Sequence, residues 1–202
     1  MSEAPPALPP HREPVHAEWI DYNGHLSEAY YVLVFGHATD ALMDAVGLDA
    51  DYRERTGCSL YTVEAHVRYL REVSADSELT VHTRLLGVES GKVRLIHEMY
   101  AARPTGPSAE PVDAEPPGEP VATEELFALH VDQHTGRSAP LPEPVRRAFA
   151  TRAEAPPPWA GRGIRPVVTD RTADAGPDRT TPSGADPEAA VDPDVTVEAV
   201  GG

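Results

Sequence analysis

The chain has 202 residues, and its 33 acidic and 17 basic side chains give a net charge of −16 and an isoelectric point near 4.8. This balance argues against a nucleic-acid surface and against binding to anionic membranes. The single cysteine, Cys58, excludes an internal disulfide, and we recognise neither a signal segment nor an apolar run of membrane-spanning length. We therefore expect a cytoplasmic protein.

The distribution of proline sets the expected domain limits. Of the 22 prolines, 6 lie in residues 103–120 and 8 in residues 155–202. Regular structure does not tolerate proline at this density. We expect a disordered N-terminus over residues 1–12, one domain over residues 13–153 with a flexible loop at 103–120, and a disordered acidic tail over residues 154–202.

The first predicted elements are a short strand and a long helix. Residues 14–19 are typical of a strand that enters a polar loop over residues 21–25. A long apolar helix follows and stops at Gly47, and Ser27 is able to cap its first turn. Because residues 29–35 are all apolar or aromatic, this half of the helix should be buried on every side.

Beyond the helix the pattern changes from helical to extended. Residues 49–58 are predicted to be a polar connection, and residues 144–153 a short closing helix. Alternating apolar and polar residues predict strands over residues 59–73 and 78–88. A tight turn at residues 89–91 predicts a return strand over residues 92–102, and a further strand is expected over residues 121–131 after the proline-rich loop. An antiparallel sheet that must cover a buried helix has to curl about it. The sequence therefore predicts an α+β fold.

Three segments together resemble a known family. They are DYNGHLSEAYY at residues 21–31, SLYTVEAHVRYLREV at 59–73 and ATEELFALHVD at 122–132. They resemble the hotdog-fold acyl-CoA thioesterases, and most of all the betainyl-CoA thioesterases of carnitine catabolism. The resemblance covers about residues 13–150 and implies a hotdog fold, with an antiparallel sheet curled around one long central helix. It also implies hydrolysis of a short acyl-CoA without a cofactor. Ser27 stands where this branch has Asn, which leaves the acyl group open.

The resemblance gives Asp21 the role of catalytic carboxylate and matches Asn23 and His25 to the family's Asn and His positions. Thioester hydrolysis needs a group that attacks the thioester itself or acts as a base to activate water. It also needs hydrogen-bond donors that stabilise the oxyanion formed from the carbonyl oxygen. A carboxylate beside a helix start suits either mechanism, and both stay open. The alternative reading of these residues is an Asx turn, in which Asp21 and Asn23 only close the loop.

Aromatic side chains gather near the same loop in the sequence. Such rings can cage a quaternary ammonium group through cation–π contacts, as the betainyl substrate of the resembling enzymes would require. The rings that we assign to substrate binding are Tyr22, Tyr30 and Tyr61. Aromatic residues at these positions are also common in protein cores and in dimer interfaces, and this alternative stays open.

Two charged residues of the strand over 59–73 are further candidates for substrate binding. Glu64 is predicted to share a face with Thr62 and His66, where it can approach a cation or a partner subunit's helix start. Arg68 suits a phosphate of coenzyme A, as does the nearby Arg71. An ordinary solvated role remains open for each of them.

The sequence shows no recognised metal or nucleotide motif. His97 and Glu98 lack the second histidine of a zincin motif. His130 and His134 lack a third ligand, so these two histidines are expected to be solvated. We expect an acyl-CoA substrate, no metal and no cofactor. The competing functions are an enoyl-CoA hydratase and a non-catalytic acyl-CoA-binding protein. The long strand over 59–73 predicts a homodimer or homotetramer.

Overall fold

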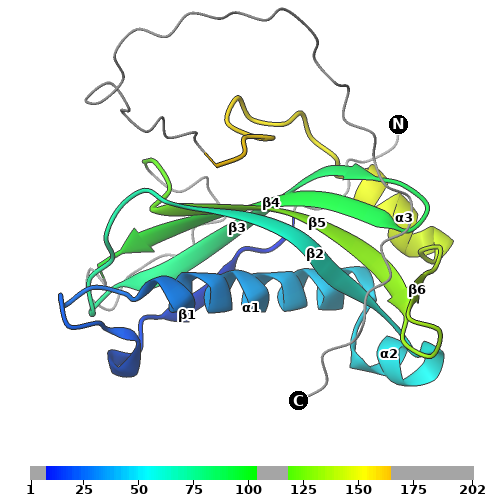
Figure 1. Cartoon of the computed structure of the whole chain (residues 1–202), viewed down its shortest axis with the longest axis horizontal. Helices are drawn as coiled ribbons and strands as arrows, with labels where there is room; N and C mark the ends of the chain where they lie inside the picture. The colour runs from blue at the N-terminus through cyan, green and yellow to red at the C-terminus, as the bar shows by residue number, and fades with distance from the viewer. Residues whose placement is uncertain (1–7, 104–117, 165–202) are drawn as a thin grey trace, which may run out of the picture.

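The computed structural model describes residues 8–103 and 118–164. Within them the strands form one antiparallel sheet, and the long helix α1, Glu28–Val46, lies across one face of it (Figure 1). The expected α+β architecture, a sheet curled around one long helix, is confirmed. Residues 1–7, most of the 103–120 loop and residues 165–202 lie outside the described residues, so the predictions of disorder there stay predictions.

The remaining elements are short helices at the ends of the sheet and strands of unequal length. In chain order they are β1 His11–Pro14, the 3-10 helix η1 Ala17–Trp19, α2 Ala50–Thr56, β2 Cys58–Tyr69, β3 Glu78–Val88, β4 Lys92–Ala102, β5 Ala122–Asp132, β6 Arg137–Ser138 and α3 Glu143–Ala150. The sheet order is β1-β3-β4-β5-β2, and β6 pairs with β5. Among the described helices, none is long and apolar enough to cross a membrane.

The strands β3 and β4 have the predicted bounds, whereas the predictions for residues 14–19 and 49–58 are wrong. The strand predicted over residues 14–19 is replaced by β1, which starts at His11 and pairs with β3, so ordered structure begins before residue 13. The expected polar connection contains α2. The Asp49 side chain accepts a hydrogen bond from Tyr52 N at 2.8 Å, and Gly57 ends α2 with φ 68°. A seven-residue helix is too short to display a helical period.

Helix α1 ends at Gly47 as predicted, with φ 84°. Ser27 is its N-cap residue, but its side chain makes no capping hydrogen bond. The prediction that residues 29–35 are buried on every side is wrong for the single chain. Val32 and Leu33 are 44% and 41% exposed, because one sheet can cover only one face of the helix.

Apolar side chains fill the space between α1 and the sheet in two clusters. The first lies near the start of α1 and includes Trp19, Tyr31, Val34, Phe35, Leu79, Val81 and Met99. The second lies near its end and includes Leu42, Leu48, Leu85, Leu95, Leu126 and Phe149. These clusters fix the helix against the sheet along its length.

Buried histidines interrupt this apolar core. The two ring nitrogens of His97 lie 2.9 Å from the hydroxyls of Thr39 and Thr83, and burial lowers the pKa of His97 to about 3. His130, which we expected to be solvated, is 1% exposed, and its Nε2 lies 2.9 Å from the Tyr52 hydroxyl. Both rings are therefore satisfied parts of the core.

A β-bulge in β2 changes which side chains share a face. Thr62 pairs with Ala128, which is buried on the α1 side of the sheet, but Glu64 pairs with Phe127 on the other side. One extra residue in a strand exchanges its two faces. The prediction that Glu64 shares a face with Thr62 is therefore wrong.

The chain after α3 runs over the sheet face opposite α1 (Figure 1). Gly161 N donates to Glu125 Oε2 at 2.6 Å, and the Arg68 guanidinium lies 5.9 Å from the centre of the Trp159 ring. The expected start of the tail at residue 154 is therefore too early, because the chain contacts the sheet as far as Gly161.

The buried carboxyl group of Glu124, opposite His97 in the sheet, leads to a prediction on pH. Burial raises the pKa of Glu124 from 4.5 to about 7. The folded protein then holds this proton more tightly than the unfolded chain. The stability that this group contributes is present below pH 4.5 and is lost as the pH rises through 7.

Glu124→Gln should therefore raise the melting temperature at pH 8 more than at pH 5, by the equivalent of about 2 kcal/mol. Calorimetry of the variant and the parent at both values of pH measures this difference. The exposed Glu54→Gln is the control and should behave as the parent. A parent and a Glu124→Gln variant with the same pH dependence would count against a raised pKa.

Candidate active site

An open cleft of about 400 Å³ lies where the loop before α1 meets the end of β2. Its walls include Asp21, Asn23, His25, Tyr31, Tyr69 and Arg71. The structure therefore brings the three predicted catalytic residues into one concave site. Clefts with a few converging polar groups are the usual place for small-molecule chemistry.

The loop that carries Asp21 closes on itself. Asp21 N donates to His25 O at 2.8 Å, and Gly24 N donates to Asp21 O at 3.0 Å. Gly24 has φ 82°, a conformation that only glycine adopts without strain. This tight turn brings Asp21 and His25 close together at the wall of the cleft.

Two longer-range contacts hold the loop against the domain. Ser27 N donates to Trp19 O and Leu26 N donates to Val73 O, both at 2.9 Å. The Trp19 ring also stacks on Tyr30, with ring centres 5.3 Å apart and planes 15° apart. The loop is therefore fixed between η1 and the segment that follows β2.

The carboxylate of Asp21 is oriented by the backbone of its own loop. Its Oδ1 accepts hydrogen bonds from Asn23 N at 2.8 Å and from His25 N at 3.3 Å. Desolvation raises the pKa of Asp21, but these two backbone donors, the Asn23 side chain and the nearby His25 together hold the pKa below its usual value. The contact with Asn23 has the geometry of an Asx turn, so the same carboxylate closes the loop and lines the cleft as an anion.

The first turn of α1 supplies the opposite charge in this cleft. Its N–H groups have no acceptors within the helix, and the helix dipole favours negative charge there. Glu28 of this turn lines the cleft together with Asp21. His25 Nε2 lies 3.4 Å from Glu72 Oε2, so the imidazole of His25 is held at the same rim.

Two tyrosines form the apolar wall of the cleft. Tyr31 and Tyr69 meet edge to face, with ring centres 5.3 Å apart, and Tyr31 donates from its hydroxyl to Arg71 O at 3.3 Å. Burial raises the pKa of both phenols, so they are neutral. Tyr69 was missed as a site residue, because long-range contacts, such as the one from Leu26 N to Val73 O, bring the end of β2 beside the loop.

The three tyrosines assigned to substrate binding lie elsewhere in the single chain, outside the cleft wall. Tyr22 is 97% exposed, and Tyr30 packs on Trp19. Tyr61 precedes Tyr69 on β2 by a distance of roughly 26 Å along the strand. Its hydroxyl accepts a hydrogen bond from Gln133 Nε2 at 3.0 Å.

The two charged candidates on β2 are also outside the cleft. The bulge directs Glu64 and Arg68 to the sheet face opposite α1, where Arg68 lies over Trp159. Arg71, two residues after the end of β2, does line the cleft and is half exposed. It forms an ion pair with Glu119 at 2.6 Å.

The comparison with protein families agrees with this fold. Residues 15–149 match the model of the Thioesterase-like superfamily. Because this match covers well over half of the sequence, the chain belongs to the Thioesterase-like superfamily. Its curled sheet and central helix are the hotdog fold that the sequence resemblance implied.

The curated relatives of this chain include proteins named for betainyl-CoA thioesterase activity. The chain is 43% identical over 166 residues to the L-carnitine dehydrogenase/betainyl-CoA thioesterase of Agrobacterium fabrum, a match over 80% of this chain. It spans only 31% of the length of that relative. It is also 38% identical over 148 residues to the betainyl-CoA thioesterase of Pseudomonas aeruginosa, a match over 73% of this chain and 85% of the relative.

Solved structures show the same fold. A protein of Pseudomonas putida KT2440, described as a candidate thioesterase, is 35% identical with a TM-score of 0.62 over 81% of this chain and 99% of that chain. A Staphylococcus aureus protein solved in complex with CoA has a TM-score of 0.67 at 24% identity, over 82% of this chain and 100% of that chain.

Proposed function

We propose that this chain is an acyl-CoA thioesterase that hydrolyses a short acyl-CoA, with betainyl-CoA as the first candidate. The observation that carries the proposal is the position of Asp21. An ionised carboxylate lies in one cleft with the first turn of α1 and with His25. The two relatives named for betainyl-CoA thioesterase support the reaction and the substrate.

The cleft suits two routes to the same products. In one, Asp21 takes a proton from water, the hydroxide adds to the thioester carbon, and the carbon–sulfur bond breaks. In the other, Asp21 itself attacks that carbon and expels the thiolate, and water then hydrolyses the mixed anhydride. In both routes the developing oxyanion lies at the positive end of α1, which lowers the barrier.

The neighbours of Asp21 have supporting roles in this proposal. His25 gives a proton to the thiolate of coenzyme A as it leaves, and Glu72 Oε2, 3.4 Å from His25 Nε2, holds the ring at the rim of the cleft. Asn23 orients the carboxylate through its backbone N–H. The products are the free acid and the free thiol of coenzyme A.

The wall of the cleft suits a cationic acyl group. Tyr31 and Tyr69 offer aromatic surface, and each cation–π contact contributes roughly 0.5–2 kcal/mol. Glu28 and Glu72 line the same cleft and add negative charge. We therefore assign the cage to Tyr31 and Tyr69.

Coenzyme A needs cationic groups for its phosphates. We assign this role to Arg71, since its guanidinium lies at the cleft and pairs well with phosphate oxygens. Its exposed partner Glu119 is then exchanged for a phosphate. A coenzyme A substrate is consistent with an enzyme of the cytoplasm that acts in carnitine catabolism.

We also propose that the chain works as a homodimer that pairs through β2. This strand is the edge of the sheet in the described residues, and an unpaired edge is a pairing site. Exposed apolar side chains lie on it and on α1, namely Tyr61, Val63, Tyr69, Val32 and Leu33. Pairing in this way would cover the exposed side of α1, and it would bring Glu64 and Tyr61 beside a second copy.

Asp21→Asn should lower kcat for betainyl-CoA by about three orders of magnitude or more, because it removes the nucleophile or base. Release of free thiol measures the turnover. The exposed Asp40→Asn on α1 is the matched control and should keep normal turnover. Near-normal thiol release by Asp21→Asn would overturn the catalytic assignment.

The same assay separates the competing functions. An enoyl-CoA hydratase leaves the thioester intact, and a binding protein retains acyl-CoA without releasing thiol. Binding without thiol release, for every short acyl-CoA tested, would replace the proposal with one of these functions.

Betainyl-CoA should be preferred over its neutral isostere 3,3-dimethylbutyryl-CoA by about 5- to 150-fold in kcat/KM, because the isostere has lost the cation. Tyr69→Leu should remove much of this preference, whereas the exposed Tyr22→Leu should keep it. Equal rates on the two substrates in the parent would exclude a cation cage.

Light scattering at micromolar concentration should give a mass of about twice the 21.7 kDa of the chain. Leu33→Asp should shift this mass toward the monomer, because it places a charge on the apolar face that pairing would bury. Ile164→Asp, at a 90% exposed position outside that face, should leave the mass unchanged. A parent that stays monomeric would refute the pairing.

A further inference from the structure

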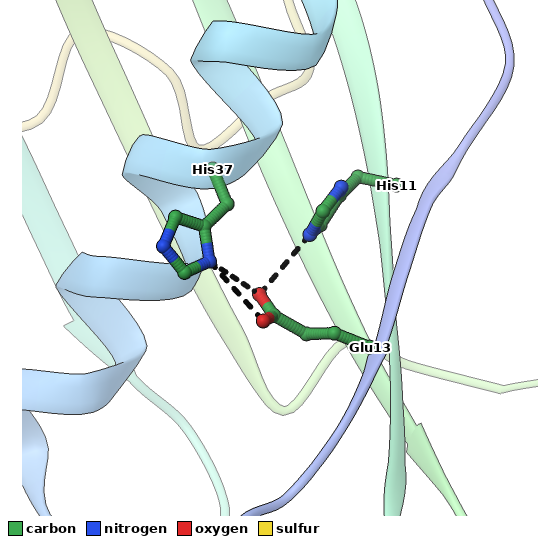
Figure 2. A group of neighbouring side chains, drawn as sticks. All are labelled: His11, Glu13 and His37. Atoms are coloured by element: carbon green, nitrogen blue, oxygen red, sulfur yellow. Dashed lines mark hydrogen bonds and ion pairs between the residues drawn. The ribbon is translucent and has the colours of Figure 1, made fainter.

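A group of three potential metal ligands lies on the flank of α1. His11 and Glu13 come from β1, and His37 comes from α1 (Figure 2). His11 Nε2 lies 3.0 Å from Glu13 Oε1, and His37 Nδ1 lies 3.0 and 3.1 Å from the two oxygens of Glu13. All three ligand atoms lie within 4.8 Å of one another.

The fold explains why these residues meet. Residues two apart on a strand point to the same side, so His11 and Glu13 project together from β1. β1 lies at the edge of the sheet next to β3, and in Figure 2 both side chains face the helix that carries His37. His37 lies about 13 Å along the helix axis from Glu28, so the group is separate from the cleft.

Burial and charge favour a cation at this position. The side chains of His11, Glu13 and His37 are 22%, 14% and 40% exposed, so the carboxylate is the most shielded of the three. With both imidazoles neutral, the group carries one negative charge. A carboxylate held away from water between two imidazoles is better compensated by a divalent cation than by neutral rings.

We propose that His11, Glu13 and His37 bind a divalent transition metal ion, with Zn²⁺ as the best match. Magnesium and calcium prefer oxygen ligands, whereas imidazole nitrogen suits zinc and its neighbours. Two histidines and one carboxylate are a known three-ligand zinc set that leaves a fourth position for water.

The distances fit this ion with a small adjustment. Zinc bonds of about 2.0–2.1 Å in a tetrahedral site separate neighbouring ligand atoms by about 3.3 Å. The hydrogen-bonded contacts here are 3.0 and 3.1 Å, and the two imidazole nitrogens lie within 4.8 Å of each other. Binding would therefore move each imidazole a few tenths of an ångström away from the carboxylate and bring the two imidazoles toward about 3.3 Å from each other. Binding replaces the proton on each facing ring nitrogen with the metal and releases it to solvent.

The bound ion fastens an edge strand to the central helix. β1 is only four residues long and pairs with β3 along one side. A metal held by two residues of β1 and one of α1 therefore ties the N-terminal edge of the sheet to the helix. This link between β1 and α1 is independent of the thioesterase proposal.

The test uses the untagged full chain after treatment with a chelator and dialysis, with zinc chloride as the probe. Calorimetric titration should show about one Zn²⁺ per chain, and saturating zinc should raise the melting temperature by about 5 °C. Cobalt chloride should give the visible absorption of a tetrahedral site. His37→Ala and Glu13→Gln should each weaken zinc binding at least about tenfold and abolish the melting-temperature shift.

The exposed His134→Ala, in the turn between β5 and β6, is the matched control and should bind zinc as the parent does. Circular dichroism and the melting temperature without zinc establish that each variant is folded, and Glu13→Gln preserves the size of the side chain if His37→Ala fails to fold. No saturable binding by the parent, or unchanged affinity in both ligand variants, would overturn the proposal. Loss of binding in His134→Ala would also overturn it.

Discussion

The packing of α1 against the inner face of the sheet determines where the other features lie. Val34 and Phe35 are fully buried against Leu79, Val81 and Met99, and this contact fixes the start of the helix beside the end of β2. The chain has to turn sharply before the helix begins, and that turn is the loop of Asp21. The cleft therefore forms where the start of α1 and the end of β2 lie side by side, held there by apolar packing.

The same packing concentrates charge of both signs in a small space. Backbone N–H groups of the loop hold the Asp21 carboxylate, and the first turn of α1 presents further N–H groups without acceptors inside the helix. Thioester hydrolysis needs this combination of an ionised carboxylate and a positive region for the oxyanion. The opposite face of α1 stays apolar and exposed at Val32 and Leu33, which connects the proposed dimer to the same helix.

Features that depend on local sequence could be predicted, and features that depend on long-range contacts could not. Alternation predicted the bounds of β3, and the tight turn after it predicted those of β4. The loop residues Asp21, Asn23 and His25 were found together because they are neighbours in sequence. The bulge in β2 was missed because an apolar residue there continues an apparently regular pattern. Tyr69 joins the site through tertiary contacts alone, as His37 joins the neighbouring strand residues His11 and Glu13.

The central claim is that Asp21 and the start of α1 act on one thioester. A crystal structure of Asp21→Asn with uncleaved betainyl-CoA tests it most directly. The account predicts that the thioester carbon lies either about 3–3.5 Å from the side chain at position 21, for direct attack, or one bridging water molecule away from it, for base catalysis. It also predicts that the carbonyl oxygen lies about 3 Å from an N–H group of the first turn of α1. A thioester bound outside this cleft, with its carbonyl away from the helix start, would contradict the account.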